Sequence, residues 1–233
     1  SSVLVCAAVH VTISSSALNT WIAEEIRTIG VEAEMDHLGR VQGSPIDWSV
    51  FAGLYGWNDP AGTVIADRGF AMHDRQTTLF GQVGINGDVP VPGHPLFYEI
   101  DRRAGYYLGA KWKYLDRIDL RAMHYDNRAD PSIPKPSIDD YAWLTVFDTV
   151  GLRFETANSF TVIAEWLAGE TPIAPDWNIR LWRYDSWALL ANQRWGAHAL
   201  TVRYDYFDMK LVQDATGPAD QVDRGTAWTL AYS

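Results

Sequence analysis

Residues 105–114 read GYYLGAKWKY and alternate between two kinds of side chain. One series is apolar or aromatic and consists of Tyr106, Leu108, Ala110, Trp112 and Tyr114. The other series consists of Gly105, Tyr107, Gly109, Lys111 and Lys113. A period of two is typical of a β-strand, because successive side chains of a strand point to opposite faces. The stretch therefore predicts a strand with one apolar face and one polar face.

The apolar face of this strand has an aromatic residue at each end and smaller residues towards its middle. Tyr106 and Tyr114 lie eight positions apart. At a rise of about 3.3 Å per residue, they stand about 26 Å apart along the strand. A tilt of about 40° reduces this distance to about 20 Å of height, close to the apolar band of outer-membrane barrels. The pattern therefore favours a lipid bilayer as the surroundings of this face.

The same alternation recurs along the chain and predicts about ten strands. Their ranges are 29–38, 46–56, 77–83, 105–114, 118–125, 143–155, 160–168, 184–193, 198–207 and 228–232. The orientation of 46–56 stays open, because this stretch is apolar on both faces. Residues 18–26 are compatible with one or two helical turns.

The connections between the predicted strands alternate in length. Tight turns at Leu115, Asn158 and Trp195 alternate with longer polar stretches at 126–140, 169–178 and 208–224. Short turns on one rim and long loops on the other are typical of bacterial barrels. We therefore predict an all-β protein, an antiparallel up-and-down transmembrane β-barrel of about ten or more strands.

Composition narrows the function classes. The chain has 233 residues, 11 Trp, 11 Tyr and 8 Phe, and a formal net charge of −10. We expect no nucleic-acid partner, because phosphate binding needs a basic surface. The single cysteine, Cys6, excludes a disulfide framework and a cysteine-based zinc site. No apolar run approaches the roughly 18 residues of a spanning helix. We also expect no cofactor and no metal.

The sequence lacks the local signatures of hydrolases, kinases and dinucleotide-binding enzymes. No two of the six histidines stand at metal-ligand spacing. His73, Asp74 and Arg75 form the densest polar cluster, but no nucleophile lies near them, so we interpret the cluster as a polar loop or pore-lining patch. Adjacent carboxylates such as Asp139 and Asp140 point apart and suit solvated ends. We therefore expect no enzymatic activity and assign no catalytic residue.

In a barrel, the polar face of each strand lines the lumen and the apolar face contacts lipid. The candidate lumen-lining residues are Glu32, Glu34, Lys111, Lys113, Arg121, Arg153, Glu165, Arg203 and Asp205. The candidate lipid-facing residues are Ile29, Val31, Ala33, Leu108, Ala110, Trp112, Leu200, Val202 and Tyr204. An inward-folded loop provides a candidate constriction with Asp59, Asp67, Arg68, His73, Asp74 and Arg75. Both charged sets are nearly balanced, so we predict weak ion selectivity.

A soluble or periplasmic Trp-rich β protein that binds or hydrolyses carbohydrate is the alternative. A soluble sheet also alternates, with one face in the core and one in water. Two features disfavour it: several predicted strands reach nine or more residues, where about 5–6 is usual, and the aromatic residues gather at the ends of the apolar faces. The positions of Trp112, Trp166 and Trp228 discriminate, because the alternative requires them in a core between two sheets.

The chain also resembles a group of largely uncharacterised porin-like outer-membrane proteins of Gram-negative bacteria. The matching stretches are SALN (16–19) with Trp21 and Glu24–Glu25, GLYGWNDPAGT (53–63), HDRQTT (73–78), AMHYDN (122–127) and AWTLAY (227–232) with Gly225. The resemblance implies a barrel of the bacterial outer membrane that contacts outer-membrane lipid and acts as a channel for passive or facilitated diffusion of small polar solutes. It leaves homo-oligomer formation open, and it carries over no catalytic or binding residue.

Two departures from these proteins define the expected domain limits. Residues 1–14 look foreign to the family and form an atypical N-terminal segment. Members of the family continue past AWTLAY with further strands, and Ser233 is not the terminal aromatic residue of a complete barrel. We therefore expect 15–233 to be a barrel domain that is truncated at its C-terminus.

Overall fold

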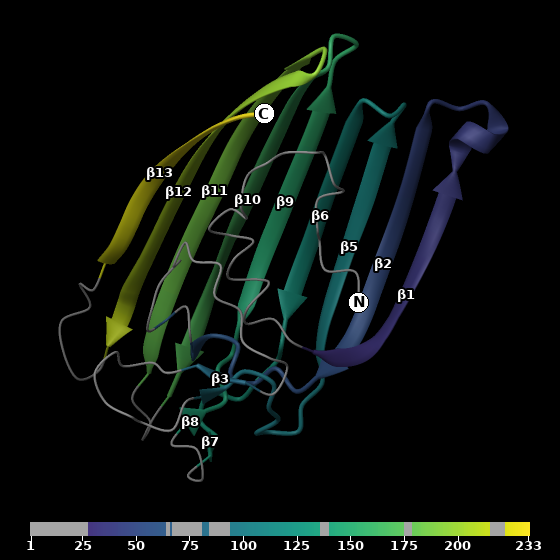
Figure 1. The fold of residues 1–233 in the computed structure, drawn as a ribbon. Helices are drawn as coiled ribbons and strands as arrows, with labels where there is room; N and C mark the ends of the chain where they lie inside the picture. The colour runs from purple at the N-terminus through teal and green to yellow at the C-terminus, as the bar shows by residue number, and fades with distance from the viewer. Residues whose placement is uncertain are drawn as a thin grey trace.

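The computed structural model describes residues 28–63, 66, 81–83, 94–135, 140–174, 179–214 and 222–233. Its main feature is a single sheet of nine antiparallel strands (Figure 1). In spatial order the strands are β1 (Ile29–Leu38), β2 (Ile46–Gly56), β5 (Gly105–Tyr114), β6 (Ile118–Asp126), β9 (Val146–Glu155), β10 (Phe160–Ile173), β11 (Arg180–Trp195), β12 (His198–Asp214) and β13 (Val222–Tyr232). Each strand of this sheet pairs with the strands before and after it in the same sheet, so the connectivity is up-and-down.

The sheet is open in the described part of the chain. Its order begins with β1 and ends with β13, and these two strands are not paired with each other. Figure 1 shows them at opposite sides of the sheet, both running towards the rim with the short turns. The all-β antiparallel prediction is confirmed, whereas closure into a barrel is not shown. Among the described residues, no helix is long and apolar enough to cross a membrane.

The connections differ strongly between the two rims. On the upper rim of Figure 1, tight turns join β5 to β6, β9 to β10 and β11 to β12, and a short 3-10 helix, η1 (Gly39–Gln42), lies between β1 and β2. Gly196 allows the tightest of these turns, because its φ of +60° suits a residue without a Cβ atom. Two small ladders, β3 (Gln82–Val83) with β4 (His94–Pro95) and β7 (Pro134–Lys135) with β8 (Asp140–Tyr141), belong to the longer connections on the lower rim.

Four sequence predictions differ from the observed strands. The strand expected at 77–83 does not join the large sheet: Gln82 and Val83 form β3, and the structure does not describe 77–80. Trp143 lies in the β6–β9 connection, because β9 begins only at Val146. The connections expected at 169–178 and 208–224 are partly strand, because β10 and β12 run on and β11 and β13 begin early. Residues 1–14 and 18–26 lie outside the described residues.

The two faces of the sheet differ in burial. The inner face carries Tyr125, Phe147 and Leu167, whose exposed fractions are 2%, 1% and 0% because the long connections pack on it. The outer face carries residues such as Leu108 and Leu189, which are 52% and 47% exposed. Paired residues of neighbouring strands share a face, so the strand register assigns each remaining residue of the strands to one of these two faces.

Candidate functional site

All nine candidate lumen residues lie on the inner face. Lys111 pairs with Arg121, Arg121 pairs with Gly151, and Gly151 pairs with Glu165. The register of the other strand pairs places the remaining candidates on the inner face as well: Glu32, Glu34, Lys113, Arg153, Arg203 and Asp205. The sequence prediction missed Asp36, Asp47 and Asp119, which share this face. Asp36 continues the alternating series of Glu32 and Glu34, so that signal was present in the sequence.

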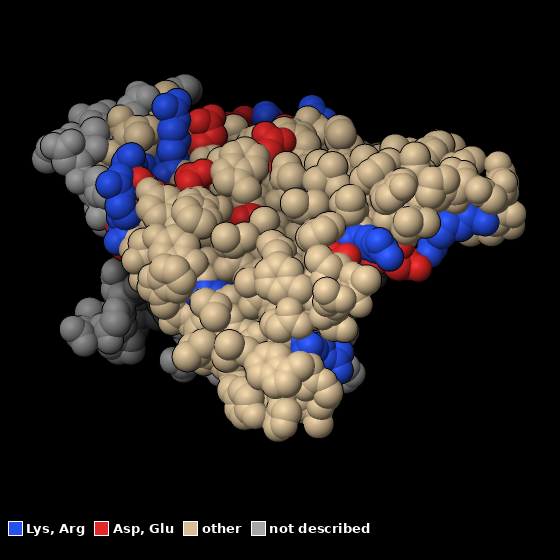
Figure 2. All heavy atoms as spheres, turned by 90° about the horizontal axis from the view of Figure 1, so that it is seen from above, with Lys and Arg blue, Asp and Glu red and all other residues tan. Residues whose placement is uncertain are grey.

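The inner-face charges form ion pairs of opposite sign. Lys111 Nζ lies 2.6 Å from Glu34 Oε1, which also accepts a hydrogen bond of 2.9 Å from Ser49 Oγ. Asp119 accepts two hydrogen bonds of 2.9 Å from Arg121. Seen from above, some Lys and Arg side chains stand beside Asp and Glu, whereas others stand alone among uncharged residues (Figure 2). Adding Asp36, Asp47 and Asp119 to the nine candidates gives seven acidic against five basic residues, so this face is slightly more acidic than the sequence prediction.

One ion pair of the inner face is almost fully buried. Arg203 Nε lies 2.7 Å from Asp205 Oδ2, and their side chains are only 4% and 1% exposed. The pairs Arg153–Glu155 and Lys113–Asp119 keep between 12% and 43% of each side chain exposed. The β12 pair is therefore packed within the protein, whereas the other two pairs stay partly exposed.

A row of aromatic rings crosses the inner face close to the long connections. Tyr55 stacks on Tyr107 and Tyr125 with ring centroids 6.0 and 5.1 Å apart, and Tyr125 stacks on Phe147 at 4.6 Å. These rings come from β2, β5, β6 and β9, and they join a core that also contains Trp143 and Trp182. The row is largely covered by the connections, so it anchors them to the sheet.

The start of the β2–β5 connection folds inward over this core. Asn58 and Asp59 are only 1% and 2% exposed. The side-chain amide of Asn127 donates to Asn58 O at 3.1 Å, and the backbone N–H of Trp143 donates to Asp59 O at 2.8 Å. A Cβ atom at Gly62 would lie 2.0 Å from Thr171 Oγ1 of β10. The segment that leaves β2 therefore reaches β10 along the inner face.

The predicted constriction loop begins at Asp59, which lies in this inward-folded segment. Asp59 is buried, so it holds the connection rather than lining an open surface. The other candidates of that loop lie outside the described residues: Asp67, Arg68, His73, Asp74 and Arg75.

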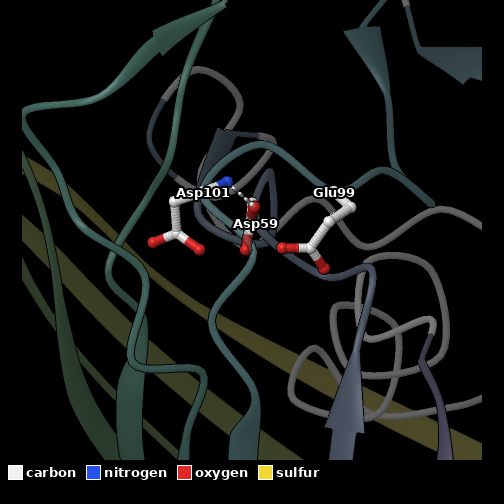
Figure 3. Close-up of side chains that lie close together, drawn as sticks. All are labelled: Asp59, Glu99 and Asp101. Carbon is white, nitrogen blue, oxygen red and sulfur yellow. Dashed lines mark hydrogen bonds between the residues drawn. The ribbon is translucent and has the colours of Figure 1, made fainter.

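Three carboxylates gather where this connection returns to β5. Oxygen atoms of Asp59, Glu99 and Asp101 lie within 4.8 Å of one another, and Figure 3 shows the three groups directed towards a common point. Asp59 Oδ2 accepts the N–H groups of Ile100 and Asp101, and the Glu99 carboxylate accepts those of Trp57 and Arg102. Because each group already accepts backbone donors, the cluster folds the connection. No sequence pattern indicated this cluster of carboxylates, because Asp59 and Glu99 lie 40 positions apart.

Burial changes the acidity of the central carboxyl in this cluster. Desolvation raises the pKa of Asp59 to about 7, against the lowering effect of its two backbone hydrogen bonds. The nearby carboxylates of Asp101 and Glu99 raise this pKa further. Asp59 therefore exchanges its proton close to neutral pH.

The outer face is apolar and exposed from β1 to β13. All nine candidate lipid-facing residues lie on it by register. Val31, Trp228 and Leu230 are 74%, 73% and 72% exposed, values far above those of a core. A soluble monomer rarely exposes a continuous apolar surface of this extent.

Aromatic residues form two bands across the outer face. The band nearer the long connections contains Tyr106, His124, Trp166, Trp187, Tyr204, Tyr206 and Trp228. The band nearer the short turns contains His37, Trp48, Trp112, Tyr114, Phe154, Phe160, Trp195, His198 and Tyr232. Aliphatic residues such as Ala110, Val150 and Leu189 lie between the bands.

Between β5 and β11, both bands cross the strands at the same slope. Following the register from Tyr106 over four strand steps leads to Arg183 of β11, and Trp187 lies four residues further towards the short turns. The same four steps from Tyr114 lead to Ala191, and Trp195 again lies four residues further. Each band therefore shifts by four residues over four steps.

The angle by which the strands tilt relative to the bands follows from this shift. Four residues rise about 13 Å and four strand steps span about 19 Å, so the tilt is about 35°. Strands of outer-membrane barrels tilt by about 35–45° against the membrane normal. Eight residues separate Tyr106 from Tyr114 and Trp187 from Trp195, which at this tilt is about 22 Å of height. From β5 to β11 the two bands are therefore parallel and at the spacing of membrane girdles, whereas Trp228 and Tyr232 on the edge strand β13 lie only four residues apart.

Charged side chains continue the outer face beyond the band nearer the long connections. Glu170, Arg183 and Lys210 occupy one row there, and Asp185, Asp208 and Arg224 occupy the next. The Arg224 guanidinium donates to Asp208 Oδ2 at 2.6 and 3.0 Å. The apolar surface thus ends at a polar margin, as it would where a bilayer meets water.

Comparisons with known proteins add no assignment. No protein-family model matches the chain, and neither the curated proteins nor the solved structures contain a match. The resemblance to porin-like proteins stays a prediction.

Proposed function

We propose that this chain forms the wall of a porin-like channel in the bacterial outer membrane, with its outer face in lipid and its inner face along a path for small polar solutes. One observation carries the proposal: on β5 and β11, four strand steps apart, aromatic residues of the outer face stand at the same two levels, about 22 Å apart in height at the slope expected of membrane-spanning strands. Trp and Tyr prefer the boundary between hydrocarbon and water. A soluble sheet has no reason to repeat that spacing on distant strands.

The inner face supplies the polar side of the proposed channel. Its charges of both signs can line water, and the connection that begins at Trp57 narrows the space over the sheet. A wall of mixed charge passes small polar solutes with little preference for one ionic sign.

The membrane location requires that both edges of the sheet be paired. Unpaired backbone groups of β1 and β13 would cost several kcal/mol each in hydrocarbon. The first and ninth strands run in the same direction, so antiparallel closure needs an odd number of further strands. Pairing with strands outside the described residues or with another chain meets this requirement.

The carbohydrate-binding alternative is less well supported. It required Trp112, Trp166 and Trp228 in a core between two sheets, but all three lie on the outer face, where Trp166 is 40% and Trp228 is 73% exposed. No second sheet of the described residues covers them.

Reconstitution tests the proposal. The purified protein should require detergent for solubility, and its addition to a planar lipid bilayer should produce stepwise conductance. A protein that stays monomeric and soluble without detergent would contradict the membrane location. A protein that inserts into lipid without any conductance would contradict the channel and leave a structural role.

A further inference from the structure

A charged pocket of about 200 Å³ opens on the inner face, where β1, η1, β2 and β5 meet near the short turns. Its charges are sorted by strand. Glu34 and Asp36 extend from β1, whereas Lys111 and Lys113 extend from β5. Arg40 and Asp47 lie at the end of the pocket nearer the turns. The pocket therefore has an acidic side and a basic side with β2 between them.

Two ion pairs frame this pocket. Glu34 binds Lys111 with 2.6 Å between oxygen and nitrogen. Arg40 binds Asp47 through its Nε and backbone N–H, and its Nη1 lies 2.6 Å from Asp116 Oδ1. Salt bridges with these carboxylates raise the pKa of Arg40. These four lining residues are satisfied within the protein.

The other two charged residues of the pocket are paired less tightly or not at all. Within the described part of the chain, Asp36 has no hydrogen-bond or ion-pair partner. Lys113 lies opposite Asp47 in the register and forms an ion pair with Asp119, but the 3.6 Å between nitrogen and oxygen is longer than a hydrogen bond and the Lys113 side chain is 43% exposed. An unpaired acid and a loosely paired, exposed base thus lie on opposite sides of the same pocket.

The strand register sets the spacing between these two groups. Asp36 pairs with Ser49, Ser49 pairs with Lys111, and Lys113 follows two positions later on the same face. Two strand steps separate β1 from β5 by about 10 Å, and the two-residue offset along β5 adds about 7 Å in the other direction, so Asp36 and Lys113 are about 12 Å apart. A hydrogen bond of about 2.8 Å at each end leaves about 6 Å between the charges of a bridging molecule. The two charges of an α-amino acid are closer than this, whereas those of a dipeptide fit.

We propose that this pocket binds a short zwitterion of dipeptide size, with its ammonium group on Asp36 and its carboxylate on Lys113. That the bound molecule is also a transported solute rests on the proposed channel function. The binding site itself does not depend on that function. A simple anion would meet Glu34 and Asp36 on one side, and a simple cation would meet Lys111 and Lys113 on the other. A neutral sugar would leave Asp36 unmatched and would bring no anion to Lys113.

Glycylglycine and the neutral sugar arabinose are suitable probes, because they are similar in size. In liposome swelling, wild type should admit glycylglycine several-fold faster than arabinose. Asp36→Asn and Lys113→Gln should each bring the two rates close to equality while arabinose entry is unchanged. Asp148→Asn, a matched charge change on the outer face, should keep the wild-type ratio. If the ratio of glycylglycine entry to arabinose entry were the same in wild type and in the two pocket variants, the inference would be overturned. Absence of arabinose entry would overturn the proposed channel function.

Saturation-transfer NMR on the detergent-solubilised full chain tests binding without transport. Wild type should give a saturable glycylglycine signal that Asp36→Asn and Lys113→Gln lose and Asp148→Asn keeps. The exchange variant Asp36→Lys with Lys113→Asp retains both charges and should bind the probe in the reversed orientation. No saturable signal in wild type would refute the site, and so would signals that persist in both single variants.

Discussion

Ala110 offers the sharpest test of the assignment of the two faces. It lies on the outer face of β5, four positions from Tyr106 and four from Tyr114. The proposed membrane therefore places it at mid-depth. An arginine on the lipid face at the bilayer midplane costs about 2–4 kcal/mol, and the cost falls to about 0–1 kcal/mol near the interfaces. We expect Ala110→Arg to lower the free energy of unfolding in liposomes by about 2–4 kcal/mol.

Gly151 provides a matched control for the same substitution on the inner face. No atom lies within 4 Å of the position of a Cβ atom at this residue, and its register partner on β10 is Glu165. Gly151→Arg therefore adds the same side chain to open space between its register partners Arg121 of β6 and Glu165 of β10, and we expect a change below about 1 kcal/mol because one neighbour repels and the other attracts it.

Denaturant titration of both variants in liposomes, followed by Trp fluorescence, measures the difference. Equal costs for Ala110→Arg and Gly151→Arg would refute the assignment of lipid to the outer face. A cost at Gly151 that exceeds the cost at Ala110 would reverse the two faces.

Three further predictions concern the inward-folded connection and the inner wall. Asp59 has a pKa of about 7 in the folded protein and about 3.9 in an unfolded chain. Between these values only the folded state keeps the proton, so the contribution of Asp59 to stability falls as pH rises. The Asp59→Asn variant has no ionisable group at this position and does not lose stability in this way. In paired denaturant titrations, its free energy of unfolding relative to wild type should rise by about 2 kcal/mol between pH 5 and pH 8. A pH-independent difference would contradict the shifted pKa. Gly62→Ala should cost about 1–3 kcal/mol because its Cβ atom meets Thr171, and Thr171→Gly should restore much of that loss; a fully stable Gly62→Ala protein would show that the connection does not contact β10. The nearly balanced inner wall should give only a small reversal potential across a tenfold salt gradient, whereas a strongly anion-selective pore would show that its basic residues dominate.

Period-two alternation explains why some strands were predicted well. The predicted range 105–114 coincides with β5, and 29–38 coincides with β1. The nine candidate lumen residues share one face for the same reason, because a strand has only two faces. Where the pattern was clear, it specified both the strand and the direction of its side chains.

The ends of the long strands were missed because the surroundings change along them. Beyond the aromatic band, the outer face of β10–β13 becomes charged at Glu170, Arg183 and Lys210. The inner face of the same stretch carries buried apolar residues such as Trp182, Tyr184 and Met209, so the polarity of the two faces is reversed there although the backbone pairing continues. Strand ends therefore could not be read from polarity alone.

The connections could not be predicted because their contacts join distant parts of the chain. The carboxylates of Asp59 and Glu99 meet only after the connection has folded back towards β5. The contact between Gly62 and Thr171 likewise joins the β2–β5 connection to a strand far along the sequence. Neither position carries a local pattern that distinguishes it from an ordinary loop residue.

Site-directed spin labelling along β5 tests the central claim most directly. Single cysteines at 107, 108, 110, 111, 112 and 113, in a Cys6→Ala background, would carry the label in liposomes. The outer-face positions Leu108, Ala110 and Trp112 should be accessible to oxygen dissolved in lipid. The inner-face positions Tyr107, Lys111 and Lys113 should be accessible to a water-soluble nickel complex, giving a period of two with opposite phases. Equal access of the nickel complex to both sets would contradict a membrane location of the outer face.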